Sequence, residues 1–491
     1  MALTSDEEAR VRAMLSAFEG GQQLDDLPLA TNEIQDKIIE VFDTKSGASG
    51  YMGLKDAVRM AGSPSCGRVW NEDNATPKSA TWFGSLEMLR HLPEILGLGG
   101  YLVKNDHSRR KLDRTNHYRF ANGETAKLDG SMGHYQWGWG KKMYIAIYNI
   151  GPLLYEEISL SPIPGQYNYV IPVGSISASG LACLERSTDT LVSYINEGAD
   201  YRGGDNNESY DGTYRTLLGR CATNRTVEQF RAAARKNGPG WLGSSMRHSF
   251  VVTILFDIIM GTHYDQSAFI AEKDSDGLYQ GGLGPGVTTL GSTKWGEYNG
   301  YRPFLPTSAG VELGDGVGVV NYDVLAEDGS VYYTAPVPVF FGLKFPSGYI
   351  WRMMDDEFGQ VNEDTSITHL VAPSIYGTWT VGDATGMVAY STSPTQGSGY
   401  IKKLSRDNCE LWCTQIGATE TTYETSHFWN TSGAVSGFRL CLRGGSAHYG
   451  GLCGLSTLVV SFAVSYASVF CGSSLCEAEE DWPVEPVYIA A

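Results

Sequence analysis

Basic residues are scarce in this sequence, and the shortage limits the partners it can have. The chain of 491 residues holds 37 Lys and Arg against 55 Asp and Glu, which gives a formal net charge of −18 at pH 7. An acidic surface repels the phosphate backbone of DNA or RNA. We therefore expect no nucleic-acid partner.

The sequence also lacks a recognisable secretory leader and a dense cysteine framework. Its start, "MALTSDEEARVRAML", is charged from the sixth residue and has no apolar run. The cysteines are scattered and odd in number, at Cys66, Cys183, Cys221, Cys409, Cys413, Cys441, Cys453, Cys471 and Cys476. These features predict reduced thiols in a protein made in the cytoplasm without a signal peptide.

Catalytic and metal-binding motifs are missing as well. There is no nucleophile elbow, phosphate-binding loop or zinc-binding helix motif. Cys409 and Cys413 could form half a metal site, but no second ligand pair follows at a suitable spacing. "DSDG" (274–277) begins like a calcium loop without its later acid, so a turn explains it better. His134 is more typical of a packed histidine than of a ligand, and we expect no enzyme, metal or cofactor.

What is abundant is glycine (59) and tyrosine (28), while long periodic helical segments are few. This composition predicts an α+β fold rich in strands and loops. Composition shifts and a proline-spaced stretch at 159–174 divide the chain into three expected parts. These are an N-terminal helical segment for attachment or oligomerisation (1–44), a small mixed α/β-strand domain (45–165) and a large C-terminal domain (166–491).

Several helices and one strand can be placed from local patterns. Residues 4–18 and 29–43 both have a capping residue followed by an apolar stripe, which could pack on its own domain or on other copies of the chain. Residues 226–238 begin at a Thr cap and end at Gly, and 243–261 are apolar nearly all round, so that helix should be buried. The alternation in "KMYIAIYNI" is typical of a half-buried strand.

The stretch "GGLCGLSTLVVSFAVSYASVFCGSSLC" (450–476) has no charged side chain and is long enough to span a bilayer. Its serines, glycines and acidic following flank disfavour a spanning helix, and its β-branched and aromatic residues favour strands. Residues two apart would then share one face of a strand or extended loop. The side chains of one face would be small or aliphatic, and those of the other face would be chemically miscellaneous. We expect no membrane insertion here.

The sequence "FRLCLRGGSAHYGGLCGLSTLVVSFAVSYASVFCGSSLC" (438–476) resembles the variable region of proteins mutated by diversity-generating retroelements. The family pattern has an "RGG" lead-in, here Arg443 to Gly445, and a "GSRLC"-like close, here 472–476. The resemblance extends over about 170–476 through "YRGGDNNESYDGTYRTLLG", "FRAAARKNGPGW", "DGLYQGGLGPGV" and "FFGLKFPSGYIWRMMDD". This chain departs from the pattern at Ser474, where Arg is usual, and its N-terminal third matches only in general character.

The resemblance implies a C-terminal C-type lectin fold of the formylglycine-generating-enzyme type, with a variable region at about 438–476. Adenines of Asn codons are replaced in such regions, which cannot produce Lys, Glu, Gln, Trp or Met, and residues 446–470 contain none of these. Scaffold positions would be Ala447, Gly450, Gly454, Leu455, Ala463, Ala467 and Gly472. The diversified, ligand-binding residues would be Ser446, His448, Tyr449, Leu452, Thr457, Val459, Ser461, Phe462, Tyr466, Ser468 and Phe470.

Proteins of this family are commonly phage tail-fibre proteins that bind a receptor, protein or glycan, on a bacterial surface. The resemblance therefore implies a virion protein, a homotrimer, and contacts with other tail proteins. Two rivals remain: a diversified bacterial surface protein, and an oxidase with a copper-binding cysteine pair, for which Cys471 and Cys476 are the nearest candidates. A further alternative is that 446–470 is ordinary core, which predicts that the miscellaneous set is buried.

Overall fold

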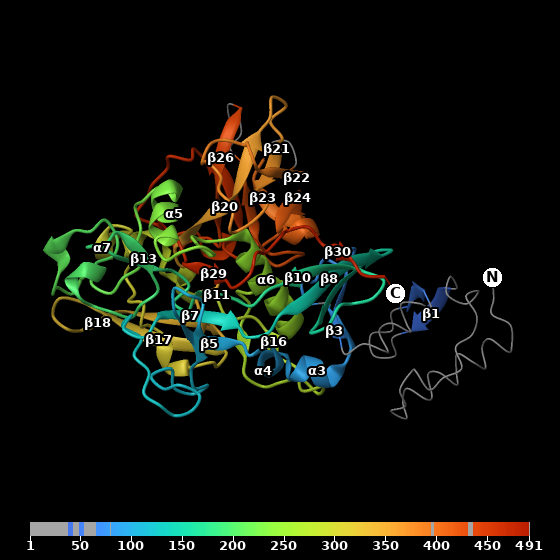
Figure 1. The fold of residues 1–491 in the computed structure, drawn as a ribbon, viewed down its shortest axis with the longest axis horizontal. Coiled ribbons are helices and arrows are strands. Elements are labelled where there is room, and N and C mark those ends of the chain that lie inside the picture. The colour runs from blue at the N-terminus through green and yellow to red at the C-terminus, as the bar shows by residue number, and fades with distance from the viewer. Residues whose placement is uncertain are drawn as a thin grey trace.

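The computed structural model describes residues 65–78, 80–393, 397–430 and 436–490, together with the backbone of 38–42 and 49–53. Over these ranges the fold is mixed and strand-rich with few helices, as the composition predicted. Three large sheets surround one long helix (Figure 1). The predicted helix at 4–18 lies outside the described residues.

The first two sheets combine strands from distant parts of the chain. The first has the order β30-β10-β8-β9-β3-β4, made of β30 (Val487–Tyr488), β10 (Tyr167–Ile171), β8 (Met143–Ile150), β9 (Leu153–Ser159), β3 (Ser65–Asn71) and β4 (Thr81–Gly84). The second has the order β14-β29-β11-β7-β5-β6, made of β14 (Trp241–Leu242), β29 (Cys476–Ala478), β11 (Gly174–Ser177), β7 (His134–Trp139), β5 (Gly99–Val103) and β6 (Arg109–Lys111). The strand predicted at "KMYIAIYNI" is thus confirmed as β8.

The third sheet is built by the C-terminal part of the chain. Its order is β22-β21-β20-β26-β27-β25-β23-β24, made of β22 (Val388–Ser393), β21 (Ile367–Val371), β20 (Trp351–Val361), β26 (Gly437–Arg443), β27 (Leu458–Phe462), β25 (His427–Trp429), β23 (Gly399–Ser405) and β24 (Trp412–Ala418). A ninth strand, β28 (Cys471–Gly472), pairs in parallel with β20. Figure 1 shows this sheet in orange and red above the other two.

Smaller sheets complete the described strands. They are β1 (Ile38–Phe42) with β2 (Ser49–Gly53), β12 (Cys183–Glu185) with β13 (Thr190–Val192), β15 (Phe269–Ile270) with β16 (Gln280–Gly281), and β17 (Gly318–Leu325) with β18 (Val331–Phe340) and β19 (Leu343–Lys344). Short 3-10 helices lie at Ala199–Tyr201, Glu208–Tyr210, Gly286–Leu290, Val311–Leu313, Asp407–Cys409 and Gly450–Leu452.

The described α-helices include the two that were placed from the sequence. They are α3 (Leu86–Arg90), α4 (Leu92–Leu96), α5 (Val227–Arg235), α6 (Met246–Met260) and α7 (Gly291–Asn299). Every residue of α6 except Ser249 is buried, and the helix contacts strands of all three large sheets. Because α6 has no solvent-facing side, it buries polar residues such as Arg247 and Asp257 together with its many apolar ones. The prediction of a buried helix at 243–261 is confirmed.

The strand pairings correct one expectation about the N-terminal half. Residues 38–42, predicted to be helical, form β1, which pairs antiparallel with β2 (Ser49–Gly53). The β-branched and aromatic side chains of "IIEVF" favour a strand once a partner is present. The expected boundary at 165/166 also falls inside two sheets, since β10 pairs with β8 and β11 pairs with β7. The strands on either side of this boundary share sheets.

Candidate functional site: an aromatic surface on the third sheet

Residues 438–476 resemble a variable region, and we call them the variable segment because of that resemblance. A buried charge network holds β26 against its neighbours at the start of this segment. Arg443 Nε donates to Glu357 Oε2 at 2.7 Å, and Arg443 Nη2 donates to the other oxygen of Glu357 and to the carbonyl of Leu411. His369 lies 2.9 Å from Glu357 and 2.7 Å from Glu410. Burial alone would raise the pKa of Glu357, but Arg443 and His369 outweigh it and hold this pKa at about 2.

Two glycines then turn the chain away from the sheet. Gly444 and Gly445 have φ angles of +86° and +85°, a region that favours glycine. A Cβ on Gly445 would lie 2.4 Å from Cys453 Sγ, so the chain passes too close there for any side chain. The "RGG" lead-in therefore has a local reason: Arg443 anchors the strand, and the glycines start a tight turn.

The end of the variable segment, residues 472–476, is hydrogen-bonded to the loop that precedes α6. Ser244 N donates to Ser473 Oγ at 2.9 Å, and Ser474 N donates to Ser244 Oγ at 2.8 Å. Ser474 Oγ donates to the carbonyl of Gly180, and Leu475 N donates to Ser177 Oγ. Ser474 is fully buried, so the departure from the family pattern lies inside this hydrogen-bonded closure. The variable segment is thus held firmly at both ends.

The predicted ligand-binding residues do not all reach solvent. His448 is exposed, and seven are half-buried: Tyr449, Leu452, Ser461, Phe462, Tyr466, Ser468 and Phe470. Ser446, Thr457 and Val459 are buried, which corrects the expectation that they face a ligand. Among the predicted scaffold residues, Ala447, Gly454 and Gly472 are buried, Gly450 and Leu455 are half-buried, and Ala463 and Ala467 are exposed.

The three buried positions have structural roles that explain their placement. Cys453 Sγ donates to the carbonyl of Ser446 at 3.2 Å. Thr457 Oγ1 donates to the carbonyl of Leu452 at 3.0 Å and accepts from His427 N at 3.2 Å. Val459 lies within β27, paired with both β26 and β25. A ligand cannot contact these side chains in this conformation.

The expected alternation is divided between a strand and a loop. Residues 458–462 form β27, whereas 463–470 form turns and irregular structure. Tyr466 N donates to the carbonyl of Ala463, and Asn224 N donates to the carbonyl of Ser468. A turn breaks the period of two, which is why Ala463 and Ala467 are exposed. The stretch 450–476 contains no long helix.

Aromatic side chains gather where this loop covers the third sheet. We call the group formed by Tyr301, Trp429, His448, Tyr449, Phe462, Tyr466 and Phe470 the aromatic surface. Phe462 and Tyr466 stack with ring centroids 4.1 Å apart. Tyr449 contacts Trp429 at 5.4 Å and stacks on His448 at 4.6 Å. Tyr449, Phe462, Tyr466 and Phe470 rest on one core cluster, which fixes their positions while leaving part of each ring accessible.

Two members of the aromatic surface were missed by sequence reasoning. Trp429 comes from β25, which pairs in parallel with β27 through Val459. Tyr301 follows α7 and contacts His448 at 5.7 Å and Phe470 at 6.4 Å. Both residues lie outside the resembling variable region, and no local pattern marks them, because their position depends on pairings between distant segments.

Two residues considered from the sequence as possible metal ligands, His134 and Asp274, have structural roles. His134 is buried, lies 2.9 Å from Asn105 Oδ1 and packs beside Tyr194 and Trp241, as expected of a packed histidine. Asp274 Oδ1 accepts from the backbone N–H groups of Asp276 and Leu278, which confirms the turn.

The cysteines of the oxidase alternative are both buried, and they pack in different core clusters. Cys471 belongs to the cluster beneath the aromatic surface, and Cys476 to the one around α6. Burial raises the pKa of both thiols far above the ordinary value.

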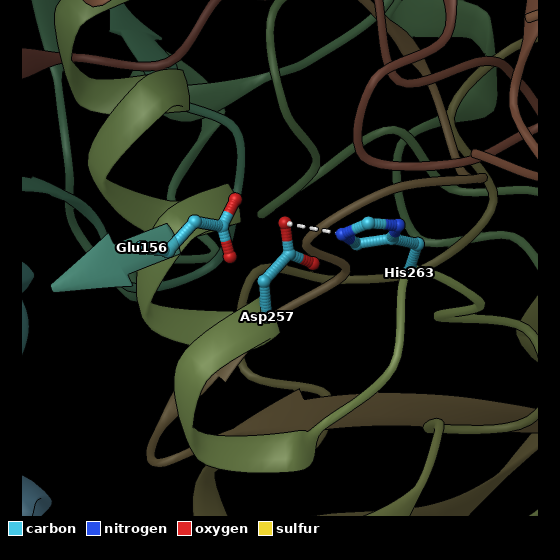
Figure 2. Close-up of side chains that lie close together, drawn as sticks. All are labelled: Glu156, Asp257 and His263. Carbon is cyan, nitrogen blue, oxygen red and sulfur yellow. Dashed lines mark ion pairs between the residues drawn. The ribbon is translucent and has the colours of Figure 1, made fainter. Parts of the chain in front are cut away.

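One group of side chains elsewhere brings possible metal ligands together. Within the described residues, this group consists of Glu156 of β9, Asp257 of α6 and His263 just beyond α6. Their ligand atoms all lie within 4.8 Å of one another. Figure 2 shows Asp257 between the other two, with its carboxylate directed toward the His263 ring. Glu156 and Asp257 are buried, the His263 side chain is 9% accessible, and none of the three belongs to the aromatic surface.

None of the helices in the described ranges combines the length and apolar content needed to cross a membrane.

No known protein-family model matches the chain, and a search of curated proteins finds no similar sequence.

Proposed function

We propose that this protein is a phage tail protein that binds a bacterial surface receptor through a retroelement-diversified surface. The observation that carries the proposal is the aromatic surface, which is formed largely by the segment that resembles a variable region. Half-buried Tyr and Phe rings supply a large contact area at low entropic cost, and neighbouring Ser and His side chains adapt their hydrogen bonds. Accessible aromatic groups of this kind are typical of partner-binding sites.

The rigid attachment of the variable segment supports the same function. Arg443 and the closing serines fix its two ends, and the rings rest on a packed core. A side chain that changes between copies of the gene therefore changes the surface without changing the fold. Tyr301 and Trp429 would form a constant part of the binding surface, next to the positions that vary.

The wider assignment rests on the resemblance. It includes a C-type lectin fold, a homotrimer, other tail proteins as neighbours and a place in the virion. The alternative function, that of a diversified bacterial surface protein, would use the same surface. The location of the protein therefore distinguishes the two functions. Immunogold labelling of phage tails against host envelopes makes that distinction.

The diversification is tested by deep sequencing of codons 440–476 in a propagated population. We expect substitutions at the codons of the eleven predicted ligand-binding residues, and few at the codons of Ala447, Gly454 and Gly472, which are buried. Among the eleven, the exposed and half-buried positions should vary most, because buried Ser446, Thr457 and Val459 reject large or charged residues. Substitutions spread evenly over the segment would contradict the proposal.

The binding role is tested by truncating the stacked pair in F462A/Y466A. Truncation of central aromatic residues at interfaces typically costs at least about 2 kcal/mol, which is roughly a 30-fold loss of affinity. We expect adsorption of the purified protein to host cells to fall by this factor, measured by flow cytometry. The matched control Tyr167→Ala removes an exposed ring, 60% accessible, from β10 of the first sheet and should leave adsorption unchanged. Equal losses in both variants would contradict the assignment of the surface.

A further inference from the structure

The buried group around Asp257 joins three parts of the chain. Arg406, which lies just after β23, contacts the carboxylates of Glu156 at 3.0 Å, Glu424 at 3.0 Å and Asp257 at 3.9 Å. His263 lies 3.7 Å from Asp257 and 3.8 Å from Glu424. The group therefore links β9 of the first sheet, the central helix α6 and loops of the third sheet.

The charges of this group do not balance. Three carboxylates, those of Glu156, Asp257 and Glu424, face one guanidinium, that of Arg406. With all three acids ionised, the formal sum of these charges is −2.

A second buried group in the same protein offers a comparison. Around His369, the carboxylates of Glu357 and Glu410 face Arg443 and a histidine whose pKa is raised by these two acids against the effect of burial. Each carboxylate there contacts the His369 ring, and Glu357 also binds Arg443. The two acids also lie on opposite nitrogens of the His369 ring, so they cannot converge on one ion.

One oxygen atom of the Asp257 group is left without a hydrogen-bond donor. Asp257 Oδ2 is inaccessible to solvent and accepts no hydrogen bond, whereas Glu156 Oε1 is ion-paired with Arg406 Nε at 3.0 Å. Asp257 Oδ2 has His263 Nε2 at 3.7 Å and Arg406 Nη2 at 3.9 Å, both beyond hydrogen-bonding distance. Buried carboxylate oxygens of this kind are costly unless a cation or a proton satisfies them.

We propose that Glu156, Asp257 and His263 form a binding site for one divalent transition-metal ion, such as Zn²⁺. Two carboxylate oxygens and a neutral imidazole are suitable ligands for such an ion. Atoms 3.7 Å apart, as in Asp257 and His263, can both lie about 2.1 Å from one ion. A dication also cancels the charge of −2 that Arg406 leaves.

The surroundings of the three ligands fit this role. Trp70 Nε1 donates to Glu156 Oε2 at 2.8 Å, and the Trp70 ring stacks on His263 at 3.7 Å, which orients both ligands. A cavity of about 30 Å³ adjoins Trp70, His263 and Glu424 and is also lined by the half-buried residues Glu72 and Lys402. It leaves room for about one water molecule beside His263.

The site is tested on the full chain after treatment with a chelator. We expect titration calorimetry with Zn²⁺ to give one ion per chain, and Zn²⁺ to raise the melting temperature. Co²⁺ should give a visible absorption spectrum of a site with mixed oxygen and nitrogen ligands. In the alternative, two protons balance the charge and no metal ion binds. Zn²⁺ up to about 1 mM would then give neither binding heat nor a shift in melting temperature, and this result would overturn the proposal.

Variants connect the binding to these residues. Asp257→Asn keeps the side-chain volume and removes the charged ligand, so Zn²⁺ affinity should fall by at least about 100-fold, more than loss of a residue that only orients a ligand. His91→Ala removes an exposed histidine and should keep the affinity. Undiminished binding by Asp257→Asn would also overturn the proposal. If that variant does not fold, the stoichiometry and Co²⁺ spectrum of the unaltered chain decide the question, and neither depends on receptor binding.

Discussion

At the scale of single residues, Arg443 connects the variable segment to the scaffold. Its guanidinium is buried, makes two hydrogen bonds to Glu357 and one to a backbone carbonyl, and directly precedes the glycine turn. The sequence pattern marked this arginine only as part of a lead-in. Its partners Glu357 and Leu411 are 86 and 32 residues away along the chain, so the reason for the arginine is visible only in the fold.

Substituting Arg443 by Ala should destabilise the protein by about 3–5 kcal/mol, because Glu357 would remain buried without its partner. Urea denaturation followed by circular dichroism measures this loss. The matched control is Arg114→Ala, which breaks an exposed ion pair with Glu94 and should cost less than about 1 kcal/mol. Comparable losses in the two variants would show that burial of the pair is not what matters.

At the scale of elements, α5 shows where local sequence is sufficient. Thr226 and Gln229 form a reciprocal capping box, and Val227, Phe230, Ala233 and Ala234 face the core. These signals lie within a few residues of one another, so the helix at 226–238 was predictable, and its observed span is 227–235. The segment 29–43 has similar signals, yet its last part forms β1, because pairing with β2 outweighs a weak helical preference.

Replacing Thr226 by Ala should lower the free energy of unfolding by about 1 kcal/mol, since the N–H of Gln229 loses its acceptor. Thr226→Ser keeps the hydroxyl group and should retain most of the stability. Urea midpoints of both variants measure the difference. If Ser and Ala lower the midpoint equally, the hydroxyl cap is not the source of the stability.

At the scale of the whole molecule, distant segments complete each other's sheets. The short C-terminal strand β29 lies between β11 and β14, and β11 in turn pairs with β7. Trp137 and Trp139 of β7 are fully buried in the cluster that also contains most of α6. Cys441, Leu458 and Cys476 from residues 438–476 belong to the same cluster, so both halves of the chain contribute to this core.

A fragment comprising residues 166–491 should consequently fail to fold cooperatively. It lacks β7, so one edge of β11 and much of the core around α6 would be exposed. We expect no sharp thermal transition and a weak near-ultraviolet circular dichroism signal, with the full chain as the control. A cooperative transition in the fragment would show that the expected boundary at 165/166 does separate an independent domain.

The sequence by itself determined the features that depend on neighbouring residues. These include the strand-rich composition, the caps of α5, the buried character of α6, the alternation in β8 and the likeness of 438–476 to a variable region. Only the tertiary structure decided which variable positions face solvent, which distant rings join them, and that Glu156, Asp257 and His263 meet. The physical reason is that strand pairing and burial are set by contacts between segments up to hundreds of residues apart, which no local pattern records.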